Sequence, residues 1–447
     1  MKSLKKFLAL FLSLALCLSM FVGCGSKADE ATEDPSEAPS GSEGASVEVL
    51  GDAASLGIPA NMGSAYGENA PTILSSYGVT DVVPQDATMT AVVAVDKDGN
   101  PILTNAQLQF FFWEEFYQMQ EQYGEYYMSM LGMDTTKPLS QQASLMENYT
   151  WEQYFLEALT TTFSNFYALA SAATAAGFAL PEKDLETLDY YTSTDGDFVQ
   201  DIINAGYESL EDYLHSFYGP GVDMEDYRTY LENYLLAMAY YNDVLYIPVL
   251  EATTEADVEA YFDENAEKYE ADGLAKANNV SVRHILIAPV GETDAETGEY
   301  SEEQWAAAEV EAQRVFDMWL ENPTEDYFAE LANDHSTDGG SNTTGGLYED
   351  FAPGEMVAEF NDWSFDQTRS YGDHAIVKSP YGYHIMFFVE QTETRVWYDT
   401  VLNDIAGSAA TAALEQAKKD FPVYFDYTQV RIVDVIALLP PATGEEE

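Results

Sequence analysis

The segment "VSVRHILIAP", residues 280–289, has the apolar pattern of a β-strand with a histidine set into it. A second segment, "YGYHIMFFV" at residues 381–389, has the same feature. The chain has only 5 His in 447 residues, so two histidines in such strands need a physical reason. A buried neutral imidazole must both donate and accept a hydrogen bond. If the strands are neighbours in one sheet, His284 and His384 can bond to each other. Otherwise they are two unrelated core histidines, each with its own polar partner.

The sequence between the two histidines contains further short motifs in a set order. After the His-Ile-Leu of the first strand come "FAELA", "HSTD", a Gly-Gly-Leu, a Gly-Glu-Met followed by Glu-Phe, and finally a Gly-Tyr-His-Ile strand. Six ordered blocks do not arise from composition. Over residues 276–392 they closely resemble the parvulin (rotamase) family of peptidyl-prolyl cis-trans isomerases.

The resemblance implies a set of site residues. His284 and His384 correspond to the paired active-site histidines of the family, and Ser379 corresponds to the hydroxyl that supports them. Asp338 falls where family members carry Cys or Asp, and Ser336 lies just before it. The residues that match the family's pocket for the substrate proline ring are Leu347, Met356 and Phe360.

The chain also departs from the family pattern. "GGLYEDF" has one residue more than the commonest spacing, which affects the assignment of Leu347 most. The loop after the first strand, "APVGETDAETGEYSEE", has no Lys or Arg, so selection of a phosphorylated residue before proline is not expected. The resemblance implies neither a metal nor a cofactor.

The N-terminus predicts export and lipid anchoring. "MKSLKK" is a basic region, the apolar run at residues 7–22 is too short for a comfortable membrane span, and "FVGC" follows it. This segment resembles the bacterial lipobox, which implies that Cys24 is lipid-modified. The only other cysteine, Cys17, lies in the segment that would be removed, so we expect no disulfide.

The composition is strongly acidic. Lys and Arg number 18 against 78 Asp and Glu, a formal net charge of −60. Such a charge repels phosphate backbones and anionic lipids, so nucleic acid is not an expected partner. Solubility alone explains the charge, although cationic peptides or divalent cations would also suit it.

A mostly helical region precedes the first histidine strand. Residues 89–104 predict a hairpin around an Asp-Gly turn, and Thr104 with Gln107 fits a helix capping box. Tyr- and Met-rich segments with helical spacing follow; such stripes usually form a core, although they could line a groove for unfolded chains. The predicted helices cover residues 108–131, 144–177, 209–219, 223–246 and 253–271. After the last histidine strand, residues 396–421 predict a helix and 428–438 a closing strand.

The expected fold class is therefore α+β, with a small antiparallel sheet and surrounding helices in the parvulin-like part. The architecture resembles the extracytoplasmic foldase lipoproteins of the PrsA type and the SurA-type chaperones. The predicted divisions are a signal peptide at residues 1–23, the anchor and a flexible linker at 24–87, a helical chaperone-like domain at 88–275, the parvulin-like domain at 276–392, and a C-terminal helix and strand at 393–447 that pack back on the helical domain.

The resemblance implies a lipid-anchored isomerase and foldase that acts on X–Pro bonds of unfolded or partly folded secreted polypeptides, outside the cytoplasmic membrane. An alternative is an extracytoplasmic holdase in which the parvulin fold is retained but inactive and the helices bind the client. A solute-binding lipoprotein would share the anchor and the acidic composition but lack the six motifs.

Overall fold

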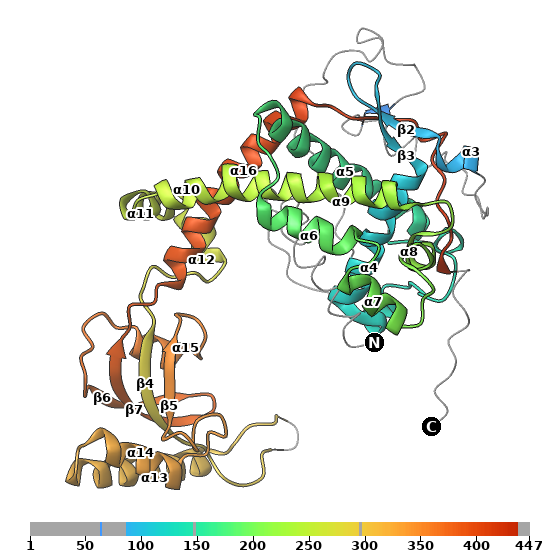
Figure 1. Cartoon of the computed structure of the whole chain (residues 1–447). Coiled ribbons are helices and arrows are strands. Elements are labelled where there is room, and N and C mark those ends of the chain that lie inside the picture. The colour runs from blue at the N-terminus through green and yellow to red at the C-terminus, as the bar shows by residue number, and fades with distance from the viewer. Residues whose placement is uncertain (1–62, 65–85, 146–148, 295–296, 437–447) are drawn as a thin grey trace. The chain divides into compact units, whose positions relative to one another are not determined.

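The computed structural model describes residues 63–64, 86–145, 149–294 and 297–436. Its contacts divide the chain into two units (Figure 1). The first unit runs to Pro248 and resumes at Ser408, and the second comprises Val249–Gly407. The predicted signal peptide, Cys24 and nearly all of the linker lie outside the described residues. None of the helices in the described part of the chain has the length and apolar character needed to cross a bilayer.

The first unit begins with the predicted hairpin. Strands β2 (Val92–Val95) and β3 (Pro101–Thr104) pair antiparallel, and Thr104 caps helix α4 (Asn105–Met130) in a capping box with Gln107. Both predictions are thus confirmed. Helix α4 is interrupted at Gly124, whose φ of 74° and ψ of 161° are not helical.

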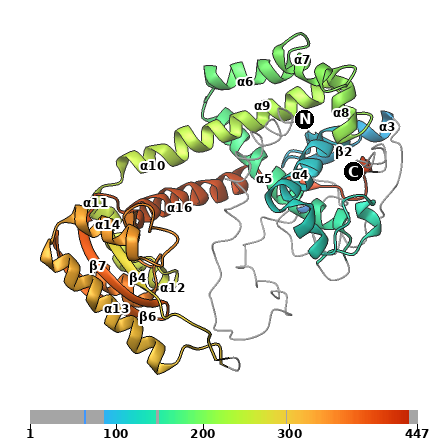
Figure 2. The same ribbon diagram turned by 90° about the horizontal axis from the view of Figure 1, so that it is seen from below.

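The remaining helices of this unit follow the predicted segments, with one difference in a boundary. Helix α5 starts at Trp151 rather than near residue 144, because Thr150 and Gln153 form a capping box at that point. Helix α6, which lies alongside α9 (Figure 2), and helix α7 come between predicted segments. The bounds are α3 Asp86–Met89, a 3-10 turn Leu139–Gln141, α5 Trp151–Ala175, α6 Glu182–Thr192, α7 Asp197–Asn204, α8 Leu210–Tyr218, α9 Met224–Tyr240 and a π-helical turn Tyr241–Tyr246.

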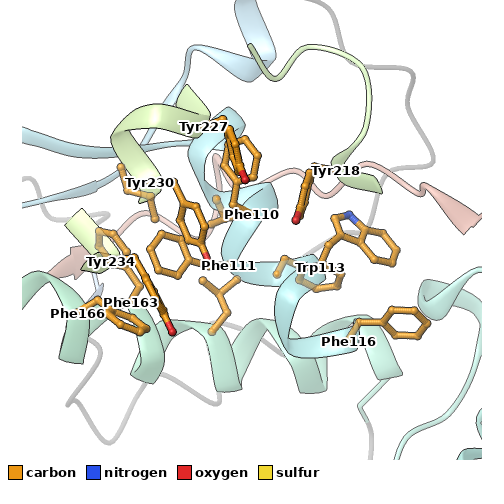
Figure 3. Close-up of a cluster of buried hydrophobic side chains, with 14 of the residues drawn as sticks. Phe110, Phe111, Trp113, Phe116, Phe163, Phe166, Tyr218, Tyr227, Tyr230 and Tyr234 are labelled. Carbon is orange, nitrogen blue, oxygen red and sulfur yellow. The ribbon is translucent and has the colours of Figure 1, made fainter. Parts of the chain in front are cut away.

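Aromatic rings from α4, α5, α8 and α9 form the centre of the first unit (Figure 3). Phe110 stacks on Tyr230 at 5.3 Å between ring centroids, and Phe111 meets Phe163 edge to face at 5.2 Å. Such pairs add to the free energy of burial and hold rings in defined orientations. The aromatic side chains of these helices therefore form part of the core of the first unit.

The C-terminal segment corrects one prediction. The predicted closing strand at residues 428–438 is not formed in its described part, residues 428–436. The structure instead has a two-residue strand, β8 (Tyr424–Phe425), which pairs with β2 and with β1 (Gly63–Ser64). The sheet order is β1-β8-β2-β3. Residues 430–436 are largely buried and have no strand pairing among the described residues.

Side chains of α4 replace a neighbouring strand for this segment. The amide of Asn105 donates to Gln429 O and accepts from Arg431 N, both at 2.8 Å. The amide of Gln109 donates to Arg431 O at 2.8 Å and accepts from Val433 N at 2.9 Å, and the indole of Trp113 donates to Val433 O at 3.2 Å.

This ladder of hydrogen bonds can repeat along the segment because the rise of one helical turn nearly equals the rise of two extended residues. Four residues of helix rise about 6.0 Å, and two residues of extended chain rise about 6.6 Å. Side chains at i, i+4 and i+8 of α4 therefore reach every second residue of the segment, while Val430 and Ile432 between them enter the core.

We expect Gln109→Met to destabilise the first unit by about 2–4 kcal/mol, because it leaves the buried Val433 N and the part-buried Arg431 O without their side-chain partner. Gln120→Met, at a half-exposed position of the same helix, should change the free energy of unfolding by less than about 0.5 kcal/mol. Urea unfolding of the full chain measures both. Equal effects of the two substitutions would show that the amide ladder does not stabilise the C-terminal segment.

The second unit is built on an antiparallel sheet of order β5-β4-β7-β6. Its strands are β4 Val280–Ile287, β5 Leu347–Phe351, β6 His374–Ser379 and β7 Gly382–Gln391. Helices α13 (Glu302–Glu321) and α14 (Glu325–His335) cover one face around Ile285, Ile385 and Phe387 (Figure 1).

The other face of this sheet carries the shorter helix α15 (Ala358–Ser364), which packs with Val282, Met386 and Phe388. A further cluster joins the helices α11 (Glu255–Glu264) and α12 (Ala266–Ala271), which follow α10 (Ile247–Ala252), to the start of α16 (Val396–Asp420). The helices, the small antiparallel sheet and its flanking helices confirm the α+β class.

One glycine allows β5 to approach β4 closely. Gly346 has a φ of 69°, its carbonyl accepts from His284 N at 2.8 Å, and a Cβ at this position would lie 2.1 Å from His284 O. A side chain cannot occupy that space without moving the strand that carries His284.

Gly346→Ala should therefore destabilise the second unit by at least about 3 kcal/mol, from the left-handed backbone and the clash together. Gly372→Ala is the matched control, since Gly372 also has a positive φ but a Cβ there meets nothing within 4 Å. The control should cost only about 1–2 kcal/mol. If urea unfolding gave the same loss for both substitutions, the close approach would not be the constraint.

Candidate functional site

The two strand histidines meet inside the sheet of the second unit. Strands β4 and β7 are neighbours, and their register pairs His284 with Met386 and Leu286 with His384. The imidazoles therefore lie diagonally on one face, with 3.0 Å between the two Nδ1 atoms. Both residues are nearly enclosed, at 3% and 5% exposure. They are thus partners of each other, and the alternative of two unrelated core histidines is excluded.

Polar side chains continue this contact on both sides. The hydroxyl of Ser379, at the end of β6, lies 2.7 Å from His384 Nε2. On the other side, His284 Nε2 lies 2.9 Å from Asp338 Oδ2, in the loop after α14. The result is a hydrogen-bonded chain from Ser379 through both imidazoles to Asp338.

With both imidazoles neutral, one proton arrangement satisfies every contact in the chain. A carboxylate only accepts, so His284 Nε2–H donates to Asp338 and leaves His284 Nδ1 as an acceptor. His384 Nδ1–H then donates to His284, and His384 Nε2 accepts from the hydroxyl of Ser379. Each buried ring both donates and accepts, as a neutral imidazole requires.

The surroundings fix the charge states of two members of this network, His384 and Asp338. Burial, followed by the neighbouring His284, lowers the pKa of His384 to about 4, so this ring is neutral at pH 7. The hydrogen bond from His284 is the largest influence on Asp338 and holds the pKa of this carboxyl well below its usual range. The network therefore combines a fixed carboxylate at Asp338 with a neutral ring at His384.

Two further residues bind Asp338 and were not predicted. The buried Ser341 donates its hydroxyl to Asp338 Oδ2 at 2.5 Å and lies 3.2 Å from His284 Nε2. The phenol of Tyr348 donates to the same oxygen at 3.0 Å. Burial, then the charge of Asp338, raises the pKa of Tyr348, so the phenol stays protonated. No periodic pattern marks a serine in the Gly-rich turn after "HSTD", so only the fold shows its role.

The apolar side of the site is built from α15 and β5. The ring of Phe360 meets His284 and His384 edge to face, at 5.2 and 5.4 Å between centroids. The half-buried Met356 belongs to the same cluster. The structure does not bring Leu347 to this face: it pairs with Arg283, one residue out of phase with Tyr348, which pairs with Val282. The ring of Tyr348, and not the side chain of Leu347, lies against His284, at 5.3 Å between centroids.

Ser336 lies close to the network without joining it. Its buried hydroxyl accepts from the backbone nitrogens of Leu286 and Asp338, at 3.0 and 3.3 Å. These bonds tie the end of α14 to β4 and so position the loop that carries Asp338. His374 is the exposed first residue of β6 and lies against the ring of Trp319.

The low pKa of His384 predicts that the folded state becomes less stable in acid. Below pH 6.5 the unfolded chain binds a proton at this histidine while the folded ring does not, so stability falls as the pH drops from 6.5 towards 4. Between pH 7 and 5 the loss should be about 2 kcal/mol, at about 1.4 kcal/mol per pKa unit.

Urea unfolding of the full chain at pH 7 and pH 5, followed by amide signals of β4 and β7, tests this. His384→Gln should remove most of the extra loss, and His374→Gln, at an exposed histidine, should retain it. A histidine signal that NMR assigns to His384 and that titrates near pH 6.5 would contradict the buried neutral ring.

Part of the chain is similar to known proteins. Residues 262–392 match the family model described as the PPIC-type PPIASE domain. Foldase protein PrsA 1 of Listeria innocua is 27% identical over 205 residues, which are 46% of this chain and 56% of the relative. Foldase protein PrsA of Halalkalibacterium halodurans is 26% identical over 200 residues, 45% of this chain and 50% of the relative. The chain thus spans about half the length of these curated relatives.

Solved structures of the same kinds are also similar. The peptidylprolyl isomerase PrsA from Bacillus anthracis is 18% identical with a TM-score of 0.21, over 53% of this chain and 95% of that one. A SurA-like chaperone from Campylobacter jejuni is 22% identical with a TM-score of 0.23, over 50% of this chain and 77% of that one. From the family match, residues 262–392 form a parvulin domain of the PPIC type, in a chain related to the PrsA foldases.

Proposed function

We propose that this protein is a membrane-anchored peptidyl-prolyl cis-trans isomerase and foldase that assists secreted proteins outside the cytoplasmic membrane. The observation that carries the proposal is the chain from Ser379 through His384 and His284 to Asp338, next to the ring of Phe360. The PPIC-type family match and the PrsA relatives support it.

The reaction is rotation about a bond rather than making or breaking one. Amide resonance gives the X–Pro bond a barrier of about 20 kcal/mol. An enzyme lowers this barrier by binding the twisted amide more tightly than either planar form, and each tenfold in rate requires about 1.4 kcal/mol of that difference. No nucleophile, metal or cofactor is needed for such a step.

Exposure assigns different roles to the carboxylate and the histidines. The side chain of Asp338 is 19% exposed, so it can face a substrate, whereas the enclosed imidazoles cannot. In the twisted amide, the carbonyl oxygen loses negative charge because conjugation with nitrogen is lost. A fixed carboxylate beside that oxygen favours this loss. His284, Ser341 and Tyr348 hold the carboxylate in place, and His384 and Ser379 hold His284.

The proline ring would bind on the apolar side of the same site. Met356 is partly exposed and can contact a substrate, while Phe360 of the same cluster is buried against both imidazoles. Tyr348 borders both the apolar and the polar parts through its ring and its hydroxyl. We include Tyr348 in the pocket in place of Leu347.

The proposed location and partners rest on the N-terminal sequence and the relatives. Residues 1–23 would be removed as a signal peptide, and lipidated Cys24 would anchor the protein to the outer face of the membrane. The PrsA relatives carry the name foldase, which agrees with unfolded polypeptides that contain X–Pro bonds as clients. The net charge of −60 makes nucleic acid an unsuitable partner.

The second candidate is a holdase that binds clients through the first unit and does not catalyse. A cavity in the first unit that is lined by aromatic side chains, among them Phe111 and Phe163, favours a binding role for that unit. Catalysis by the second unit decides between the candidates, since a holdase would not accelerate isomerisation of a short peptide.

Asp338→Ala should lower kcat/KM for cis-to-trans isomerisation of a short X–Pro peptide by at least about tenfold, a loss of about 1.4 kcal/mol of transition-state stabilisation. Asp334→Ala, an exposed acidic position on α14, should leave the rate unchanged. A rate that is unchanged by Asp338→Ala would remove the carboxylate from the mechanism. A full-length chain that is folded but does not accelerate isomerisation would favour the holdase.

A further inference from the structure

The first unit contains a cavity of about 500 Å³ that shares no residue with the histidine site. It is lined by β3, α4, α5, α9 and residues 421–422, which all belong to the first unit. Cavities of roughly 300–1,000 Å³ are typical of sites that enclose a ligand. Its principal apolar lining residues are Leu103, Phe111, Phe163, Phe166, Tyr230 and Phe421.

The aromatic floor of this cavity is preformed. Phe111 meets Phe163 and Tyr230 edge to face at 5.2 and 4.9 Å, and Phe166 lies 6.0 Å from Phe111 (Figure 3). Rings that pack on one another lose little freedom when a ligand arrives, so the ordering cost of binding is small. The floor therefore suits a bulky apolar group.

The mouth of the cavity is acidic. Asp96 and Asp98 line it from the turn between β2 and β3. The carboxylate of Asp96 is fixed by hydrogen bonds from the backbone nitrogens of Asp98 and Asn100, at 2.9 and 2.8 Å. Burial, and then the charges of Asp96 and Asp98, raise the pKa of Tyr167 on the cavity wall. Both carboxylates thus act on the space next to the aromatic lining.

The lysine at the mouth of the cavity, Lys97, already has a hydrogen-bond partner. Among the described residues that line the cavity, Lys97 is the only one with a positive charge, and its ammonium donates to Asp420 O at 3.1 Å. An anionic ligand would face the two carboxylates, whereas a cationic group would be attracted to them.

We propose that this cavity binds a bulky apolar side chain of an extended polypeptide that carries Lys or Arg beside that side chain. The inference rests on the proposed function, because it assigns the recognition of unfolded clients to the first unit. The apolar side chain enters the aromatic floor and the neighbouring cation remains at the acidic mouth. Proline plays no part in this recognition, so binding here is independent of isomerisation.

The test uses the full-length chain and a fluorescent decapeptide that has Phe between two Lys residues and no proline. Thr174 is exposed and lines the cavity, so Thr174→Trp should obstruct it without disturbing the core. We expect this variant to weaken binding, measured by fluorescence anisotropy, by more than tenfold. Ala179→Trp, at an exposed position that does not line the cavity, should bind like the unmodified chain.

The charge requirement has its own variants. Asp98→Asn should weaken binding about threefold and reduce its dependence on salt, since one attractive charge is lost at the mouth. Glu186→Gln, at an exposed acidic position on α6, should have no effect. Peptides in which Phe becomes Ala, or both Lys become Glu, should bind at least tenfold more weakly.

Equal binding by the chain and by Thr174→Trp would overturn the proposal, as would equal binding of the Phe and Ala peptides. A change in oligomeric state on Thr174→Trp, with peptide binding unaffected, would show that a second copy of the chain is the occupant and would also overturn it. The isomerase assay separates the two hypotheses. Thr174→Trp should retain isomerisation of a short X–Pro peptide, and Asp338→Ala should retain binding of the proline-free peptide.

Discussion

Two imidazoles that are buried in one sheet and hydrogen-bonded to each other are the constraint on which the second unit depends. A neutral ring must both donate and accept, so the pair needs an acceptor at one end and a donor at the other. Asp338 and Ser379 meet these needs from a loop and a strand end that are far apart in the sequence. The strand register, the close approach at Gly346 and the bonds of Ser336 all hold these elements in the required positions.

The same constraint fits the proposed isomerisation, which requires no acid–base chemistry. Enclosure keeps His384 neutral, while convergent donors keep Asp338 ionised although it is partly buried. A carboxylate that is fixed by its partners needs little reorganisation when a substrate amide twists beside it. In the proposed function, the histidines hold the Asp338 carboxylate in position and keep it ionised, and they transfer no proton.

In the first unit, side chains of α4 order residues 430–436, which pair with no strand in the part of the chain that the structure describes. Amide side chains of α4 take the role of a neighbouring backbone, since four residues of helix and two of extended chain have nearly the same rise, about 6–7 Å. Helix α4, which supplies these amides, also supplies Phe110 and Phe111 to the aromatic core. The same helix therefore holds the C-terminal segment in place and lines the cavity.

The strands, helix starts and motifs of this protein could be predicted from its sequence, because neighbouring residues determine each of them. Strand alternation marked β4 and β7, capping residues marked the start of α4, and ordered motifs indicated a parvulin domain with His284, His384, Asp338 and Ser379. Features that depend on contacts between distant segments were missed or misplaced. Tyr348 rather than Leu347 faces the histidines because a bulge-affected register decides which side chain of β5 points inward. Ser341 carries no pattern, and residues 430–436 have the composition of a strand but bond to helix side chains, since only the tertiary structure decides which partner is near.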